Sequence, residues 1–245
     1  MAKTSKEISD GLRERIRSGD LPPGARLPGE PTLMKTHGIA KETARRSLAI
    51  LVNEGLAVRR RGSGTYVREF HPIRRVANRR LAPDRWRAGK SIWSADTTEH
   101  PVQVTGLRVH EAPAPDDVAR ALGLPEGSAV VIRERVYVVD GNPAQAAVSY
   151  LPADLVRDSP IAREDTGPGG TYARLAELGA EPDQFIEELR SRMPSQEEAQ
   201  LLHLAGGTPV IEIFRTALTE DGRPVEVNRM VLDAGMYVLE YHVQG

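Results

Sequence analysis

The first 67 residues contain three apolar stretches with helical spacing, followed by a hairpin that turns on glycines. Ile8, Leu12 and Ile16 recur every four residues after a Thr4-x-x-Glu7 capping box, which predicts a helix that ends near residue 18. The same patterns predict three further elements: a short helix over 30–37, a longer helix over 40–54 and a hairpin over 56–67. Three helices and a hairpin in this order are the plan of a winged helix-turn-helix.

From Pro101 onward the pattern changes to strands that alternate with short helices. Apolar runs at 129–140 and 209–218 return through Asp-Gly turns, which is typical of antiparallel hairpins. Residues 183–192 suit either a helix or a strand, and we expect a strand. The expected fold class is therefore α+β, with a winged helix-turn-helix over 1–70, a basic interdomain linker over 71–95 and an antiparallel-sheet α/β effector and dimerisation domain over 96–245.

Charge also divides the chain into two parts. Residues 1–90 carry 21 Lys and Arg against 9 Asp and Glu, whereas the remainder carries 12 against 25. This split indicates a basic N-terminal part that binds a polyanion and an acidic C-terminal part with another role. The chain has no cysteine, which excludes disulfides, thiolate zinc sites and cysteine nucleophiles. We expect a cytoplasmic protein that needs neither a metal nor a cofactor.

The third predicted helix and the hairpin carry the candidate DNA contacts. In a helix-turn-helix the N-terminal residues of the second helix of the pair meet base edges in the major groove. Arginine suits guanine because its planar fork can donate two hydrogen bonds. A glycine-built wing tip can approach a sugar-phosphate backbone closely. The alternative is a solvated basic helix with an ordinary hairpin. The candidate contacts are Lys41, Glu42, Thr43, Arg45, Arg46, Arg60, Arg61, Gly62, Ser63 and Gly64.

The second half contains a candidate site for a small anion. Arg133 and Arg135 are two apart on a predicted strand, so both point to one face, where paired guanidiniums suit a phosphate or a carboxylate. The alternative is an ion-pair ladder with Glu212 or Glu226 on a solvated face. A helix N-terminus can also favour an anion. The further effector-binding candidates are Ser149, Tyr150, Thr171, Tyr172, Arg215 and Glu226.

These residues carry a family resemblance. "LPPGARLPGEPTLMKTHGIAKETARRSLAILVNEGLAVRRRGSGTYV" resembles the DNA-binding signature of the GntR family of bacterial transcription regulators. "VVIRERVYVVDGNPAQAAVSYLPADL", "TYARLAELG" and "GTPVIEIFRTALTEDGRPVE" resemble the UTRA effector domain of its HutC-like branch, whose fold is similar to that of chorismate lyase. The resemblance implies a transcription regulator, which we expect to be a homodimeric repressor. It would bind a palindromic operator in double-stranded DNA and be released by a small anionic effector.

Some positions depart from the family's pattern. The arginine that usually follows the glutamate of the second helix is Pro31, the usual Ser or Thr cap of the third helix is Ala40, and the basic residue after that cap is Lys41 rather than arginine. Thr43, Arg45 and Gly64 match. In the effector domain the amino-sugar branch has polar residues where this chain has Ala147, Gly170 and Leu232. These losses favour a less polar anion than a sugar phosphate.

A ligand-responsive regulator has two alternatives from other classes of function. An enzyme would need a catalytic constellation, yet no glycine-rich phosphate loop, nucleophile elbow or pair of histidines at metal spacing is found in the sequence. A ligand-independent architectural protein that coats DNA would be basic throughout, whereas the second half is acidic. We therefore expect a regulator and not an enzyme.

Overall fold

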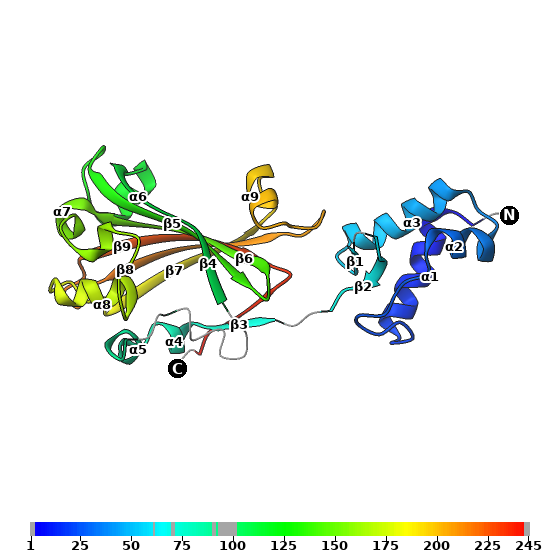
Figure 1. Ribbon diagram of the computed structural model, residues 1–245, viewed down its shortest axis with the longest axis horizontal. Coiled ribbons are helices and arrows are strands. Elements are labelled where there is room, and N and C mark those ends of the chain that lie inside the picture. Colours follow the sequence, from blue (N-terminus) through cyan, green and yellow to red (C-terminus); the bar gives the residue numbers. More distant parts are fainter. Residues whose placement is uncertain (1–2, 61, 70–71, 90–91, 93–101, 243–245) are drawn as a thin grey trace. The chain divides into compact units, whose positions relative to one another are not determined.

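The computed structural model describes residues 3–60, 62–69, 72–89, 92 and 102–242 (Figure 1). The chain divides into two compact units, which are described separately. The first unit comprises Met1–His71 with Leu204–Pro209, and the second comprises Pro72–His203 with Val210–Gly245. Within the described ranges, no helix combines the length and the apolar character that crossing a membrane requires.

The first unit has the predicted order of three helices and a hairpin. Thr4 and Glu7 form the predicted capping box, and Gly38 ends the second helix in a left-handed conformation. Ala40 caps the third helix without a side-chain hydrogen bond, as expected from its methyl side chain. The elements are α1 (Ser5–Arg17), α2 (Glu30–His37), α3 (Lys41–Asn53), β1 (Ala57–Arg60) and β2 (Gly64–Val67).

A small apolar core fixes the orientation of α3. Ala44, Leu48 and Leu51 recur on one face of this helix and are buried against Leu12 of α1 and Leu33 of α2. Full burial of a leucine side chain contributes about 1.5–3 kcal/mol. Because the apolar face is held inward, the polar face of α3 is directed to solvent.

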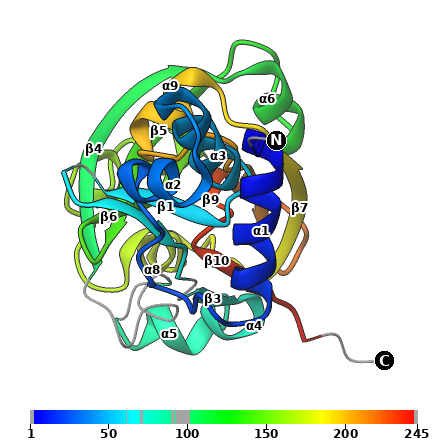
Figure 2. The same ribbon diagram turned by 90° about the vertical axis from the view of Figure 1, so that its right-hand side faces the viewer.

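The second unit is built on a six-stranded antiparallel sheet in the order β4-β5-β6-β9-β8-β7. β4 and β7 lie at opposite margins of this sheet (Figure 2). Residues 183–192, which suit either a helix or a strand by sequence, contain the edge strand β7, so the prediction of a strand is confirmed. The strands are β4 (Val102–Pro113), β5 (Ala129–Val139), β6 (Asn142–Pro152), β7 (Gln184–Arg192), β8 (Val210–Leu218) and β9 (Pro224–Asp233).

The two faces of the sheet are covered by different elements (Figure 1). The face that we call outer packs against α6 (Asp116–Leu122) through Ile132, Tyr150 and Val227. The opposite face, called inner, is covered by the following elements: β3 (Ile73–Val76), α5 (Pro83–Arg87), α8 (Gly170–Glu177) and β10 (Tyr237–Glu240). The remaining short elements are α4 (Ala77–Arg80), α7 (Ala153–Val156), the 3-10 turn Pro160–Ala162 and α9 (Gln196–Leu201).

The segment 71–95, expected to be a linker, contains secondary structure in its described part. β3 pairs in parallel with β10, and α4 and α5 follow it. Arg75, Arg80 and Trp86 are buried within the second unit. No periodicity is visible in this segment because the elements are only four or five residues long. By sequence alone, their buried arginines resemble solvated charges.

The start of α8 is pressed against α5. Gly169 has a φ of 81°, and a Cβ at this position would lie 2.5 Å from Cβ of Ala173 and 2.7 Å from the carbonyl oxygen of Trp86. The Gly169 amide also donates to the carbonyl of Gly89 at 3.0 Å. Trp86 in turn packs edge-on against the ring of Tyr172, with ring centroids 5.2 Å apart. This close approach sets the position of Tyr172 over the inner face.

We predict that Gly169→Ala lowers the free energy of unfolding by more than Gly179→Ala. Both glycines have a left-handed φ, so each substitution carries a backbone strain of roughly 1 kcal/mol. Only Gly169 lacks room for a methyl group, which adds about 1–3 kcal/mol of overpacking, whereas nothing lies within 4 Å of a Cβ at Gly179. Urea unfolding of both variants checks this, and equal losses would contradict the close contact of α5 and α8.

Candidate DNA interface and ligand site

The first two turns of α3 present the predicted polar residues to solvent. Lys41, Glu42, Arg45 and Arg46 are exposed and Thr43 is half-buried. Arg45 Nη2 lies 3.0 Å from Glu42 Oε1, an ion pair between exposed side chains one turn apart. Such a pair is weak in water and leaves the guanidinium available to another acceptor. The arrangement therefore offers donors along one exposed helix end.

The hairpin that follows has a polar, cationic tip. The Arg60 guanidinium lies over the ring of Tyr66 at 4.7 Å, and the Tyr66 hydroxyl is 2.7 Å from Ser63 Oγ. Arg60 Nη2 is also 3.7 Å from Glu69 Oε2. Gly62, Ser63 and Gly64 are exposed at the turn, while Arg61 lies outside the described residues. The stacked contact with Tyr66 orients Arg60 beside the glycine turn.

Arg26 joins this tip, although sequence reasoning did not select it. Its backbone forms an isolated antiparallel bridge to Tyr66. Arg26 Nε lies 3.1 Å from the place that a Cβ on Gly64 would occupy, and the residue is exposed. Arg26 sits in the turn-rich bridge after α1, so only the folded chain brings it to the hairpin. It adds a cation to the predicted set.

In the second unit, one polar residue from each of five neighbouring strands lies in register on the inner face. The strand pairings place Arg133 opposite Ser149, Ser149 opposite Asn228, Asn228 opposite Arg215, and Arg215 opposite Glu187. Directly opposed residues share a face of the sheet, so these side chains form a row across it. Four of them are almost completely buried: Arg133, Ser149, Arg215 and Asn228.

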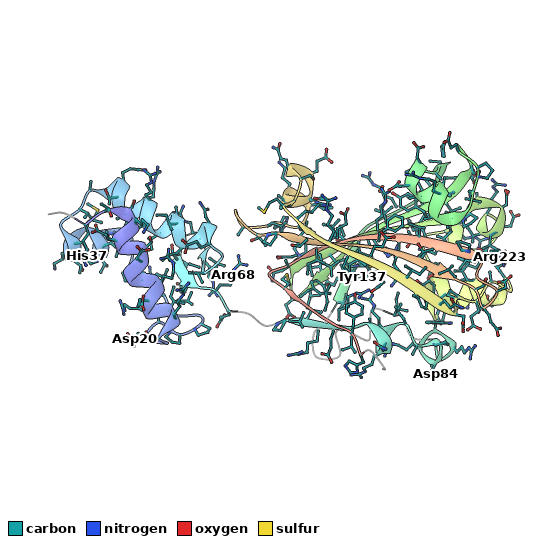
Figure 3. The ribbon with its side chains drawn as sticks, turned by 180° about the vertical axis from the view of Figure 1, so that it is seen from behind. Asp20, His37, Arg68, Asp84, Tyr137 and Arg223 are labelled. Carbon is teal, nitrogen blue, oxygen red and sulfur yellow. The ribbon has the colours of Figure 1, made fainter. Side chains whose placement is uncertain are left out.

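Ser149, which lies between Arg133 and Asn228 in this row, is a shared acceptor. Its Oγ accepts hydrogen bonds from Arg135 Nη2 at 2.9 Å and from Asn228 Nδ2 at 3.0 Å. Arg135 Nε also donates to the hydroxyl of Tyr137 at 2.8 Å. Tyr137, labelled in Figure 3, lies on the face of the sheet that β3 and β10 cover. Arg135 is therefore held by two strands: by Arg133 and Tyr137 of its own strand β5, and by Ser149 of β6.

Glu187 occupies one end of the row and binds an arginine from β3. Arg75 donates to both carboxylate oxygens of Glu187, at 3.0 Å from Nη1 to Oε2, and the Tyr241 hydroxyl donates to Oε2 at 2.8 Å. Burial opposes ionisation of Glu187, but the hydrogen bonds and charge of Arg75 outweigh it and hold the pKa of this carboxyl below its ordinary value. The pair is therefore ionic at neutral pH.

Arg215 lies between two carboxylates without a close hydrogen bond to either. Its Nη1 is 4.0 Å from Glu187 Oε1 and its Nη2 is 3.8 Å from Glu226 Oε2. Glu226 instead accepts a hydrogen bond of 2.7 Å from the Tyr172 hydroxyl. Burial raises the pKa of the Tyr172 hydroxyl well above its ordinary value, so it remains a donor. The Arg215 guanidinium also faces the Tyr172 ring at 5.7 Å.

Several polar atoms in this region have no hydrogen-bond partner among the described residues. They are Nε and Nη1 of Arg215, Oδ1 of Asn228 and Nε of Arg75. Buried donors left unpaired cost about 1–3 kcal/mol each, which favours a bound group that satisfies them. We call the following set the inner polar cluster: Arg75, Arg133, Arg135, Ser149, Tyr172, Glu187, Arg215, Glu226 and Asn228. Its four guanidiniums outnumber its two carboxylates, which makes it suited to an anion.

Arg133 has a different set of partners from Arg135. Its guanidinium donates to the carbonyl oxygens of Ile161, Arg163 and Glu164, at 3.0 Å from Nη2 to Glu164. Burial, and then the neighbouring charge of Arg135, lower the pKa of Arg133 to about 10, so it is charged at neutral pH. Arg133 thus anchors the loop after the 3-10 turn, and the donors that face the cluster come from Arg135 and Arg215.

The structure does not bring every predicted ligand residue together. Tyr150 points to the outer face, where the Arg229 guanidinium lies 5.7 Å from its ring, so it does not share a site with Arg133. Thr171 is half-buried in the first turn of α8. The structure also differs from the alternative of an ion-pair ladder on a solvated face. Glu212 pairs with Arg192 at 3.1 Å, and the inner face is buried.

Three members of the inner polar cluster were missed from the sequence. Arg75 lies in the segment that was expected to be a linker. Glu187 and Glu188 are adjacent on a strand, and the sequence does not show which of the two lies on the inner face. Asn228 lies two residues after Glu226 on one strand, so the alternation of faces could have indicated it. The signal was weak because residues 225–228 are all buried.

Comparison with known proteins assigns a family to each half of the chain. Residues 4–67 match the family model of bacterial regulatory proteins of the gntR family, and residues 99–237 match the UTRA domain. A helix-turn-helix transcriptional regulator of Streptomyces coelicolor is 37% identical over 232 residues, covering 90% of this chain and 85% of the relative. Another, from Mycobacterium tuberculosis, is 31% identical over 225 residues, covering 91% and 79%.

Solved structures give the same architecture. The crystal structure of a GntR-family transcriptional regulator superposes with a TM-score of 0.65 at 27% identity, covering 98% of this chain and 97% of that one. PhnF from Mycobacterium smegmatis gives a TM-score of 0.61 at 21% identity, covering 97% and 99%, which shows a common fold.

A winged helix-turn-helix followed by a separate antiparallel-sheet unit is the architecture that these transcription regulators share. The chain belongs to the GntR family of bacterial regulatory proteins, and its second half is a UTRA domain. The predicted family and fold class are thereby confirmed. Its relatives are transcriptional regulators, so the expectation of a regulator rather than an enzyme is also confirmed.

We predict that Glu187→Gln destabilises the protein at neutral pH, by on the order of 3 kcal/mol, because it leaves Arg75 buried without its counter-charge. Since the folded-state pKa of Glu187 is depressed, its stabilisation is present above the ordinary glutamate value and is lost as pH falls through the folded-state pKa. The difference in melting temperature between variant and wild type should therefore shrink on acidification. Glu126→Gln, at an exposed position, is the control, and a pH-independent difference would contradict the ionic pair.

Proposed function

We propose that this regulator is a homodimeric repressor, acting in the cytoplasm, that binds a palindromic operator and releases it when a small anion occupies the inner polar cluster. The observation that carries the proposal is Arg215, whose two unpaired nitrogens lie in a buried cluster with more guanidiniums than carboxylates. One relative, the transcriptional repressor NagR of Bacillus subtilis, is 24% identical over 242 residues, which supports repression.

The surroundings of Arg215 favour an anion with an apolar part. The rings of Tyr172 and Phe185 lie 5.7 and 5.9 Å from its guanidinium, and Trp86 packs against both rings. Ala147 and Leu232, where the amino-sugar branch carries polar groups, are buried on the same face. A carboxylate or phosphate on an aromatic or aliphatic body would pair with Arg215 and Arg135 and lie against these apolar side chains.

β3 provides a route from the ligand to the DNA-binding unit. It begins one residue after Pro72, where the second unit starts, and Arg75 ties it to Glu187. An anion that binds Arg215 also changes the charge around Glu187 and hence its hold on Arg75. A ligand that binds more tightly when β3 is in one position than in another favours the first position. The DNA-binding units, which are connected to β3, would shift with it. We accordingly place the functional boundary near residue 71 and count the remainder of the proposed linker with the sensor.

On the DNA side, we propose that Arg45 reads a base and that Arg60 contacts a phosphate. Arg45 is exposed one turn into α3, where a recognition helix meets the major groove. Arg60 stacks on Tyr66 beside the glycine turn, a position suited to the backbone. Lys41, Glu42, Thr43 and Arg46 complete the proposed helix contacts. At the hairpin these are Arg61, Gly62, Ser63 and Gly64.

These two roles predict different losses. Arg45→Ala should weaken binding to the specific operator by about 1–3 kcal/mol and reduce discrimination at one base pair. Arg60→Ala should weaken operator and unrelated DNA alike and flatten the dependence of affinity on salt. Fluorescence anisotropy with both duplexes at several salt concentrations separates the two. Equal, sequence-independent losses for both variants would reduce Arg45 to a phosphate contact.

Sensing is tested with Arg135→Gln and a matched control on the other face of the sheet. Arg135 has only neutral partners, so its replacement leaves no buried charge unpaired. The operator-bound protein is challenged with inorganic phosphate, sugar phosphates, aromatic carboxylates and fatty acids. An anion that releases the wild type should do so at a concentration about ten times higher or more with Arg135→Gln, since a charge-assisted hydrogen bond contributes about 1.5–3 kcal/mol.

The control is Arg229→Gln, which removes a guanidinium from the outer face of β9, where it stacks on Tyr150 and Phe214. Its response to the anion should equal that of the wild type, and the DNA affinity of both variants without anion should be unchanged. Release of Arg135→Gln at the wild-type concentration would refute the assignment of the ligand site.

A further inference from the structure

The two edges of the sheet differ in how they resist pairing with another strand. Among the described residues β4 pairs only with β5, and β7 only with β8, so each has one open side (Figure 2). Open edges expose backbone N–H and C=O groups that can accept a further strand. Proteins protect such edges with bulges, prolines or irregular register.

β4 is protected in this way and β7 is not. The register of β4 shifts between Thr105 and Arg108, around Gly106 with a φ of 61°, and the strand ends at Pro113. β7 pairs with β8 over nine successive residues without a shift, and it contains neither glycine nor proline. A regular, open edge is therefore present at β7 alone of the two.

Exposed apolar side chains also accumulate along β7. Ile186 is 55% exposed, Leu189 is 44% exposed, and Met193, the residue after the strand, is 60% exposed. Phe185 and Leu189 are on the inner face, since they lie two residues on either side of Glu187. Large apolar side chains on an open strand edge mark a surface that another chain covers.

We propose that the open edge of β7 pairs antiparallel with β7 of a second copy of this chain, centred on Leu189. The inference rests on the homodimer proposed above and adds its surface and register. A two-fold axis perpendicular to the sheet keeps each face on its own side, so opposed residues come from the same face. The pairing would join the two sheets into one.

Charge selects this register. Centred on Leu189, the pairing places Glu188 opposite the partner's Arg190, and the symmetry repeats this ion pair. Shifting the centre to Glu188 or to Arg190 would oppose two carboxylates or two guanidiniums, which is unfavourable at adjacent cross-strand positions. The chosen register also sets Leu189 against the partner's Leu189 and Phe185 against the partner's Met193. Glu187 lies on the same strand, so this contact would adjoin the inner polar cluster.

A reciprocal charge exchange tests the register. Sedimentation equilibrium of the full chain is compared for the wild type, Glu188→Arg, Arg190→Glu and the variant that carries both substitutions. Each single substitution sets like charges opposite each other twice, and the dissociation constant of the dimer should rise about tenfold or more. The double variant restores opposite charges and should return close to the wild-type value. Unchanged single variants, or a double variant as weak as the singles, would overturn the proposal.

A crosslink tests the centre of the contact directly. The chain has no cysteine, so Leu189→Cys introduces a single thiol. Opposed residues of antiparallel strands have Cα atoms about 4.5–5.5 Å apart, within the roughly 4.4–6.8 Å that a disulfide spans. Under mild oxidation this variant should become a covalent dimer, whereas Val104→Cys on the exposed part of β4 should not.

The outcomes separate this inference from the proposed function. If the wild type sediments as a dimer but Leu189→Cys crosslinks no faster than Val104→Cys, the β7 contact is refuted and the homodimer stands on another surface. If the wild type is a monomer at the concentration that represses, both the contact and the proposed homodimer are refuted.

Discussion

The ion pair between Arg75 and Glu187 is the contact on which the second unit depends most. Both side chains are almost fully buried, with exposed fractions of 0% and 6%. Removing two charges from water is costly, and an interior pair offsets that cost only when its hydrogen bonds are well formed. Here Arg75 donates to both carboxylate oxygens and Tyr241 adds a third donor. The pair therefore holds β3 against the inner face at a defined position.

The same carboxylate also lies near Arg215, and this would link stability to the sensing that we propose. Arg215 stands about 4 Å from each of its two carboxylate neighbours and leaves two nitrogens unpaired. A buried cluster in which every charge was paired would not be stabilised by a bound anion. The inner polar cluster instead combines a firm pair, which maintains the fold, with a loosely held guanidinium, which a ligand can engage. Both effects meet at Glu187, which lies on the strand of the proposed dimer contact.

Much of the fold could be predicted from local patterns. The Thr4 capping box, the glycine stop at residue 38 and the alternating strands each depend on neighbouring residues, so periodicity and turn chemistry were sufficient. The first unit and the hairpins of the sheet were anticipated for this reason. The short elements at 73–87 were not, because four or five residues cannot show a period and their burial depends on distant partners.

The inner polar cluster could be predicted only in part, for a related reason. Arg133 and Arg135 were correctly placed on one face by the two-residue repeat, but the repeat does not say which face is covered. Tyr150 was therefore grouped with Ser149 although adjacent strand residues point to opposite faces. Arg75 and Glu187 are 112 residues apart, and no local signal joins them. Long-range register decides the composition of the site, and only the folded sheet supplies it.

The most direct measurement is a crystal structure of the protein with an anion that releases it from DNA. An anionic oxygen should lie within hydrogen-bond distance of Arg215 Nε or Nη1, the donors left unpaired in the inner polar cluster. The apolar part of the ligand should then contact Tyr172 or Phe185. An anion bound elsewhere, with Arg215 still between Glu187 and Glu226 and its nitrogens unpaired, would contradict the central claim.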